Sequence, residues 1–316
     1  MAKPNLQPAK TGLITRGLKL NHLRLVVALA RSGQISQAAD ELGLTQPAAS
    51  RLTAEISRIV GHQVHRRTGK GIALTPAGLA LAERARRALI EIGDAARDLD
   101  EGASGNSGQV RIGSVTGPSI EYILPILRDV RRESPSVSID VEVAPSDVLG
   151  DMLLEGKLDF SLSRYPNDRD PTLFHGIPIG DEPISIIVRR GHPLLGPRKV
   201  ALADMLAFDW VLPAEGAILR RTVARVMHAA GLPAPTAGVV TSSFLLTLGV
   251  IKETDALAPV ATSVARYLLT SQSDIAILQT EAIFSVDTYM LLTRRGQLQT
   301  PAAAMVMGRM RNIFGI

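Results

Sequence analysis

The stretch SQAADELGLTQPAASRL, residues 36–52, restricts the possible folds more than any other part of the chain. Its two Ala-rich segments predict a short helix over 37–42, capped by Ser36, and a second helix from 46 to about 60, capped by Thr45. Each helix is too short to be stable alone, and the small side chains let two steeply crossing helices approach closely. The pattern favours a helix-turn-helix; a helical hairpin inside an ordinary bundle is the alternative.

The second of these helices is expected to expose hydrogen-bonding groups near its N-terminus, which suits a helix that reads base edges in the major groove. The contacts predicted from this face are Gln46, Ser50, Arg51 and Thr53. Residues 62–74 follow as strand, basic turn and strand, which is typical of a wing that contacts phosphates or the minor groove. The predicted wing contacts are Arg66, Arg67 and Lys70. We interpret His62 and His65 as solvated wing residues rather than metal ligands, because no carboxylate or Cys accompanies them.

The charge distribution points in the same direction. Residues 15–90 carry 12 Lys and Arg against 4 Asp and Glu, whereas residues 102–316 carry 20 against 21. A basic N-terminal third joined to a nearly neutral body is typical of a nucleic-acid-binding module attached to a second domain. A basic face that merely keeps the protein in solution is the alternative.

Thr75 and Pro76 predict the start of a long helix, with Thr as its cap and Pro in its first turn. Apolar and small residues then recur at intervals of three and four, as in a coiled coil. This seam consists of Leu81, Ala85, Ala88, Ile92, Ala95 and Leu99. On a monomer it would be exposed, so it predicts a dimer; packing against its own chain is the alternative.

A Gly/Ser-rich segment divides the chain, which at 316 residues is long enough for about two domains. We expect a flexible extension over 1–17, a winged helix-turn-helix over 18–75, a linker helix over 76–101, a hinge over 102–109 and a second domain over 110–316. In the second domain short apolar runs alternate with helical patterns, which predicts an α/β architecture with a largely parallel sheet.

The elements expected outside the helix-turn-helix can be listed by range. Helices are expected over 18–31, 119–132, 146–155, 218–230, 243–253, 262–269 and 301–313. Strands are expected over 110–115, 137–144, 158–163, 184–189, 210–213, 238–241, 256–260, 275–279 and 286–293.

The run ISQAADELGLTQPAASRLTAEISRIVGHQVHRRTGKGIALTPAGLAL, residues 35–81, resembles the N-terminal domain of LysR-type transcriptional regulators almost position for position. The sequence GHPL at 191–194 is similar to a frequent mark of the family's effector domain, so the resemblance covers nearly the whole chain. It implies an α+β multidomain fold: a winged helix-turn-helix, a linker-helix dimer and a two-lobed α/β effector domain like periplasmic binding proteins. The DNA contacts that it implies are Gln46, Pro47, Ser50 and Arg51, with Arg66 or Arg67 at the wing.

The resemblance further implies a cytoplasmic regulator, usually a homotetramer, that binds promoter DNA. A small effector controls this binding and the recruitment of RNA polymerase. The effector domain would have a first lobe of about 110–180 and 270–316 and a second lobe of about 181–269. One departure is the start of the chain, since about 17 residues precede the first helix, more than is usual in the family.

Loops at the expected strand ends predict where the effector binds, because helix N-termini and hydroxyl groups meet there. The predicted effector contacts are Ser114, Thr116, Ser163, Arg164 and Ser243. They favour a small anion, a carboxylate or sulfonate, with Arg164 as its counter-charge; a sugar is the other class considered. The alternative is that Arg164 is a solvated loop residue and Ser243 only caps a helix.

Other classes of protein are disfavoured by what the sequence lacks. It has no Cys, no run of 18 apolar residues, no Gly-x-Ser-x-Gly motif, and its six His are scattered. We read LRLVVALA at 23–30 as part of a mature helix rather than a signal peptide, because Arg24 interrupts it. We therefore expect no enzyme, no metal or other cofactor and no membrane partner. The alternative functions are a solute-binding protein or an enzyme with a basic N-terminal module.

Overall fold

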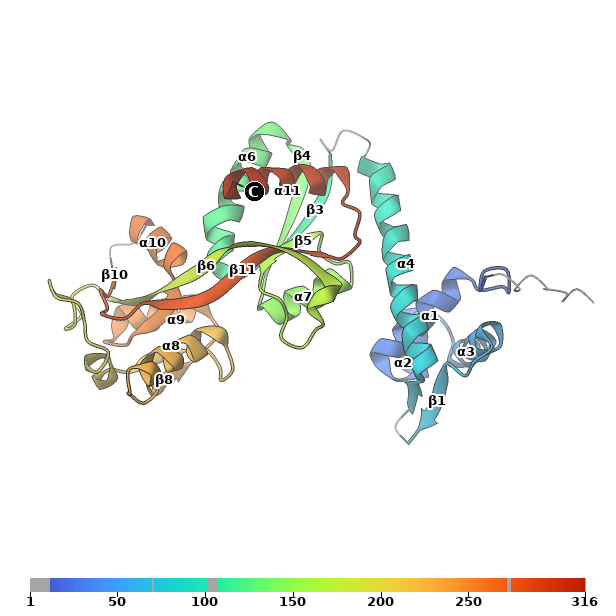
Figure 1. The fold of residues 1–316 in the computed structure, drawn as a ribbon, viewed down its shortest axis with the longest axis horizontal. Coiled ribbons are helices and arrows are strands. Elements are labelled where there is room, and N and C mark those ends of the chain that lie inside the picture. Colours follow the sequence, from blue (N-terminus) through green and yellow to red (C-terminus); the bar gives the residue numbers. More distant parts are fainter. Residues whose placement is uncertain (1–11, 70, 102–106, 272–273, 316) are drawn as a thin grey trace, which may run out of the picture. The chain divides into compact units, whose positions relative to one another are not determined.

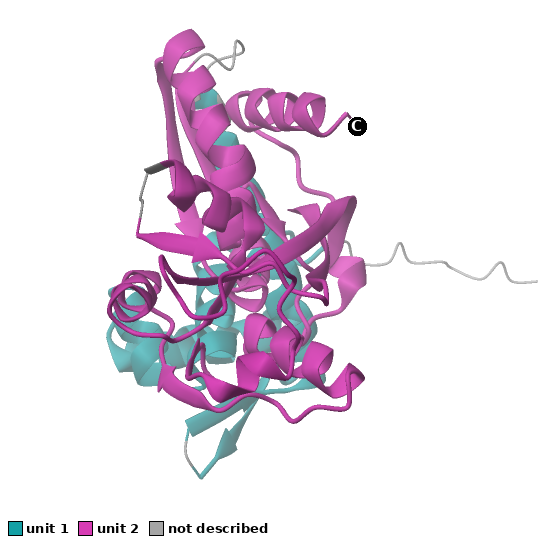
Figure 2. Cartoon of the chain, turned by 90° about the vertical axis from the view of Figure 1, so that its left-hand side faces the viewer, with its two compact units in different colours: residues 1–100 teal, residues 101–316 magenta. Residues whose placement is uncertain are grey.

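The computed structural model describes residues 12–69, 71–101, 107–271 and 274–315 (Figure 1). The chain forms two compact units, residues 1–100 and 101–316 (Figure 2). Most of the predicted extension and hinge lies outside the described residues. The last three positions of the predicted hinge, Ser107 to Gln109, instead form the start of a strand that pairs with its neighbour.

Unit 1 contains the predicted helix-turn-helix, wing and linker helix. Its elements are α1 (Leu20–Ser32), α2 (Ile35–Glu41), α3 (Gln46–Val60), β1 (His65–Thr68), β2 (Gly71–Leu74) and α4 (Pro76–Glu101). Gly33 ends α1 with a φ of 64°, a conformation that glycine adopts without strain. The Thr45 side chain accepts a hydrogen bond from the Ala48 backbone and caps α3, as predicted. Ser36 is not a cap, because α2 already begins at Ile35.

The core of unit 1 explains the small side chains at the turn. Ala38 and Ala39 of α2 and Ala49 of α3 are fully buried in one apolar cluster with Leu25 and Leu29 of α1. Three helices can meet around such methyl groups because no longer side chain holds them apart. The wing strands β1 and β2 pair antiparallel, and Ile72 joins the same cluster. The tight helix-turn-helix inferred from the sequence is therefore confirmed.

Unit 2 is a mixed α/β structure. Its strands are β3 (Ser107–Ser114), β4 (Ser136–Val143), β5 (Phe160–Ser163), β6 (Phe174–Arg189), β7 (Trp210–Leu212), β8 (Ala237–Val240), β9 (Ala258–Ala261), β10 (Ile275–Ile277) and β11 (Phe284–Arg294). Its α-helices are α5 (Thr116–Pro118), α6 (Leu124–Glu133), α7 (Ser146–Leu154), α8 (Ile218–Ala229), α9 (Phe244–Glu253), α10 (Thr262–Ser271) and α11 (Pro301–Phe314). The single turns are the π-helix η1 (Ser119–Ile123) and the 3₁₀ helices η2 (Pro171–Leu173) and η3 (Asp204–Ala207). None of the helices in the described ranges is both long and apolar enough to cross a membrane.

The main sheet is mixed rather than largely parallel, so that part of the prediction is wrong. Its order is β10-β6-β11-β5-β3-β4, with β9 also paired to β6. Strands β3, β4 and β5 are parallel, but β6 and β11 are antiparallel to each other and to their other neighbours. The reason is visible in Figure 1: the long strands β6 and β11 run side by side between the two ends of unit 2 in opposite directions.

Unit 2 is divided into two lobes, each with its own hydrophobic core. Lobe I has a core that includes Phe160 of β5 and Val306 of α11, and lobe II has a core around Trp210 of β7. The described residues after position 270 belong to lobe II as far as Val286, because Leu278, Phe284 and Val286 pack in the Trp210 cluster. The predicted return to lobe I at about 270 is therefore too early. The chain returns along β11.

Candidate functional site

The first turns of α3 form an exposed polar surface, and the wing that follows this helix in the chain is basic. Gln46, Pro47, Ser50 and Arg51 all lie on the exposed surface of α3. Arg66 and Arg67 of β1 are exposed as well. Lys70 lies outside the described residues. The three arginines form no ion pair with a carboxylate among the described residues of unit 1, so their guanidinium groups are available to phosphates or base edges.

The structure does not place Thr53 on this surface. Its side chain is 1% exposed, and its hydroxyl donates a hydrogen bond of 2.7 Å to the Ala49 carbonyl oxygen. A threonine inside a helix often satisfies its hydroxyl in this way. The prediction that Thr53 contacts DNA is therefore wrong, and the residue belongs to the core of unit 1.

We expect Thr53→Val to leave DNA affinity within about twofold of the unsubstituted protein. Valine keeps the shape of the buried side chain and removes one intrahelical hydrogen bond, which lowers the free energy of unfolding by about 1 kcal/mol. Fluorescence anisotropy with a promoter duplex measures the first quantity, and thermal unfolding the second. A tenfold loss of affinity in a variant that is still folded would show that Thr53 contributes to DNA binding after all.

The predicted seam on α4 divides into two parts. Ala85 is buried and Leu81 half-buried against the core of unit 1, so for this part packing against its own chain is correct. Further along the helix, apolar and small side chains of the seam remain exposed. These are Ala88, Ile92, Ala95 and Leu99. Only this distal half of the seam is free to meet a second copy.

Two of the predicted effector contacts are buried within lobe I. The Ser114 hydroxyl at the end of β3 donates to the Val115 carbonyl oxygen at 2.8 Å. The Ser163 hydroxyl at the end of β5 is hydrogen-bonded to the Ser161 hydroxyl, also at 2.8 Å. Both groups already have partners and no exposed surface. They shape the strand ends rather than present free donors to a ligand.

Arg164 is neither a free counter-charge nor a solvated loop residue. Its Nε donates to the Asp287 carbonyl oxygen at 2.7 Å, and its Nη2 lies 2.8 Å from Oε2 of Glu182. The two charged side chains are only 12% and 11% exposed. Arg164 therefore joins β5 of lobe I to β6 and β11, the strands that connect the lobes.

Thr116 and Ser243 are both exposed, but at different places. Thr116 begins the helical segment that follows β3, and its carbonyl oxygen accepts a hydrogen bond from Ser119. Ser243 caps α9, where its hydroxyl accepts a 3.3 Å hydrogen bond from the Leu246 backbone. In the described part of the chain, no hydrogen bond or ion pair links Ser243 to the other predicted effector contacts. For Ser243 the structure supports the helix-cap alternative.

Glu182, Gly117 and Ser263 complete the junction between the lobes and were missed by the sequence reading. A Cβ added to Gly117 would lie 2.1 Å from Oε1 of Glu182 and 3.0 Å from the Ala261 Cβ, so a larger residue at 117 would have to displace the Glu182 carboxylate. The Ser263 hydroxyl of α10 donates to the Gly117 carbonyl oxygen at 3.1 Å. The signal that could have found them is the acidic pair of GDEP, residues 180–183, directly before an expected strand.

A tyrosine pair lies beside this junction. Tyr122 belongs to η1, a π-helical turn, and Tyr289 to β11 at a shift in strand register. The ring centroids are 6.3 Å apart. Burial, and next the hydrogen bond with Tyr122, raises the pKa of the Tyr289 phenol far above its ordinary value, and Glu182 adds to the shift. Both rings therefore stay neutral, and π-helical turns are frequent at ligand sites.

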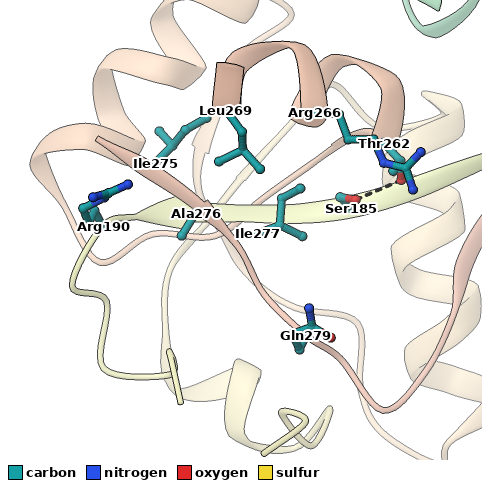
Figure 3. A pocket seen from close by; sticks show the side chains of 9 residues that line it. All are labelled: Ser185, Arg190, Thr262, Arg266, Leu269, Ile275, Ala276, Ile277 and Gln279. Atoms are coloured by element: carbon teal, nitrogen blue, oxygen red, sulfur yellow. Dashed lines mark hydrogen bonds between the residues drawn. The ribbon is translucent and has the colours of Figure 1, made fainter. Parts of the chain in front are cut away.

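A separate surface pocket of about 510 Å³ lies in lobe II between β10 and α10 (Figure 3). Its lining residues are Ser185, Arg190, Thr262, Arg266, Leu269, Ile275, Ala276, Ile277 and Gln279. Figure 3 shows Ser185 and Thr262 facing each other, and their hydroxyls are hydrogen-bonded at 2.8 Å. None of the predicted effector contacts lines this pocket.

The chain belongs to the LysR family of bacterial regulators. A family model described as the LysR substrate binding domain matches residues 103–314, and one described as a bacterial regulatory helix-turn-helix protein of the lysR family matches residues 20–79. The chain is thus a LysR-type DNA-binding transcriptional regulator with an effector-binding domain, and the resemblance drawn from the sequence is confirmed.

Among known proteins the chain is similar to HTH-type transcriptional regulators named GbpR. It is 40% identical to that of Rhizobium radiobacter over 81% of this chain and 86% of the relative, and 30% identical to that of Azospirillum brasilense over 98% and 90%. Full-length OxyR from Pseudomonas aeruginosa has the same fold, with a TM-score of 0.63 at 19% identity over 93% and 95% of the two chains. Full-length CbnR in complex with its target DNA gives a TM-score of 0.53 at 23% identity over 94% and 100%.

Proposed function

We propose that this regulator reads its promoter through the exposed surface of α3 and the arginines of the wing, as a dimer joined by the distal half of α4. The predicted contacts retained in this proposal are Gln46, Pro47, Ser50, Arg51, Arg66 and Arg67. The observation that carries the proposal is that Arg51 is exposed near the capped start of α3 and pairs with no carboxylate in the described part of the chain. That is the part of a reading helix that contacts base edges.

The effector is proposed to bind at the junction of the two lobes, around Arg164, Glu182 and Thr116. This place is supported by the convergence of strand ends, a helix start and the two connecting strands. A ligand bound there would change the relation of the lobes and, through the linker helix, the arrangement of the DNA-binding units. We further propose a homotetramer that recruits RNA polymerase in the cytoplasm and has no catalytic activity of its own.

Selection of genomic DNA fragments by the purified protein at near-physiological salt tests the proposal. Enriched sites with two-fold symmetry upstream of a few promoters are expected, because a symmetric dimer binds two half-sites one or more DNA turns apart. Diffuse binding that salt abolishes would reduce the basic surface of unit 1 to nonspecific attraction and overturn the assignment of α3 as the reading helix.

We expect Arg51→Ala to weaken binding to the selected promoter by about 1–3 kcal/mol, roughly 5- to 150-fold, if the guanidinium contacts a base edge. Arg58→Ala is the matched control, since Arg58 is an exposed arginine near the other end of α3. Anisotropy titrations on the promoter and on a scrambled duplex distinguish a base-specific contact from nonspecific charge attraction. Equal losses on both duplexes, or equal losses from both variants, would mean that Arg51 contributes charge alone.

A further inference from the structure

The pocket between β10 and α10 contains two arginines, and the described residues that line it include no acidic side chain. Arg190, directly after β6, and Arg266 of α10 are both exposed. Neither pairs with a carboxylate in the described part of unit 2. Two guanidinium groups without a neutralising partner give the pocket a positive potential, which attracts anions.

The carboxylates that lie close to this pocket in the sequence are bound to other cations. Asp255 pairs with Arg189 at 2.7 Å, and Asp274 pairs with Lys252 at 3.3 Å. The positive charge of the pocket is therefore not balanced from within lobe II, and a ligand can supply the missing negative charge.

The two arginines lie at opposite ends of the pocket (Figure 3). Arg266 is at the end where the Ser185 and Thr262 hydroxyls are hydrogen-bonded to each other at 2.8 Å. One hydroxyl uses its proton in this bond, so the proton of the other can be donated to a ligand. Thr262 is also the first residue of α10, and the N-terminus of a helix favours negative charge. This end of the pocket thus offers a guanidinium and a hydroxyl to one anionic group.

The middle of the pocket is apolar. Ile275 and Ile277 of β10 and Leu269 of α10 lie between the two charged ends (Figure 3). Leu269 is 43% exposed, so a ligand that covers it removes apolar surface from water, which contributes about 25 cal/mol per Å². A small inorganic ion cannot gain this contribution, because it has no apolar part.

The pocket also has the size of a small-molecule site. Its volume of about 510 Å³ lies within the usual range for such sites, roughly 300–1,000 Å³. We propose that it is a second ligand site, separate from the lobe junction, and that it binds an elongated organic dianion. One anionic group would pair with Arg190 and the other with Arg266 and the hydroxyl pair, with an apolar chain or ring between them. Guanidinium groups suit this task because they bind carboxylate and phosphate oxygens in a bidentate manner.

Isothermal titration of the full-length protein with straight-chain dicarboxylates, from succinate to suberate, tests the proposed site. Each dicarboxylate is compared with the monocarboxylate of the same chain length. We expect at least one dicarboxylate to bind at least tenfold more tightly than its monocarboxylate, with one best chain length set by the separation of the two ends. Sulfate carries the same charge without an apolar part, so it should bind at least tenfold more weakly than the preferred dicarboxylate.

Arg190→Gln and Arg266→Gln test the two ends of the pocket separately. Each variant removes one guanidinium, so one carboxylate of the ligand loses its partner. We expect either substitution to reduce the advantage of the preferred dicarboxylate over its monocarboxylate to twofold or less. Arg311→Gln, which removes an exposed arginine from α11 in lobe I, should leave this advantage unchanged. Thermal unfolding confirms that each variant is folded.

Three results would overturn the inference. The first is that no dicarboxylate binds, and the second is that sulfate binds as tightly as the preferred dicarboxylate. The third is dicarboxylate binding that neither Arg190→Gln nor Arg266→Gln weakens, because the ligand would then lie outside this pocket.

Discussion

Replacing both Ile92 and Leu99 by glutamate is expected to abolish the linker-helix dimer and to weaken promoter binding by about 100-fold or more. Ile92 is 50% exposed and Leu99 85% exposed on the distal half of α4, and neither packs in the core cluster of unit 1. Two glutamates on each of two paired helices bring four negative charges into one interface. Without the dimer each DNA-binding unit contacts its half-site alone, and the gain from bivalent binding is lost.

Sedimentation velocity of the full-length chain measures the first effect, and anisotropy on a two-half-site duplex the second. Leu79→Glu is the matched control, since Leu79 is exposed on the same helix but lies off the seam. On a duplex with a single half-site the double variant and the unsubstituted protein should bind alike. An unchanged sedimentation coefficient would mean that the dimer forms through another surface and that the exposed apolar residues of α4 do not contribute to it.

Features that depend on a few neighbouring residues can be predicted from this sequence. The Thr45 cap and the antiparallel wing both appear where the pattern indicates them. Caps and turns consist of hydrogen bonds between residues two to four positions apart, so a short sequence holds most of the information. The exception is Ser36, because α2 begins one residue before it and Gln34 holds the cap position. Most caps and turns can therefore be located without knowing how the rest of the domain packs.

The burial of Thr53 could not be predicted from residue spacing along α3 alone. It lies seven residues after Gln46, two helical turns along α3, so spacing alone puts both side chains on one face. Gln46 is exposed at the start of α3, but further along the same side of the helix Ala49 and Thr53 are buried in the core shared with α1. Which turns of a helix are covered depends on the packing of the whole unit. The same reason separates Ala85 from Ile92 on the seam of α4.

The surroundings of Arg164 were incompletely predicted because of a single strand. Residues 174–183 contain Gly176, Pro178, Gly180 and Pro183, which predict a loop rather than a strand. The structure continues β6 through them because β11 pairs along this segment, with shifts in register. Glu182 therefore seemed to lie in a loop, and its contact with Arg164, 18 residues away, could not be seen. Arg164 was read as a free counter-charge, whereas the chain itself supplies a carboxylate partner to it.

Gly78→Ala is expected to destabilise unit 1 by about 3 kcal/mol, the upper end of the usual range for an overpacked core. A Cβ at this position would lie 1.9 Å from the Val64 carbonyl oxygen and 3.2 Å from the Leu74 Cβ. The first of these atoms is backbone, and that same oxygen accepts a hydrogen bond from the Thr75 backbone. Relief of the clash has to move the start of α4 away from the wing.

Hydrogen exchange of the full-length chain resolves this effect, because it reports opening of unit 1 separately from unit 2. Amides of α1, α3 and the wing should lose protection, whereas those of lobes I and II should keep theirs. Gly93→Ala is the control on the same helix: its Cβ would meet nothing within 4 Å, so alanine should stabilise α4 by up to about 1 kcal/mol. If both variants protect unit 1 equally, the wing and the linker helix can separate freely. In that case a rigid contact between the wing and the linker helix could not carry a signal from the effector domain to the reading helix α3.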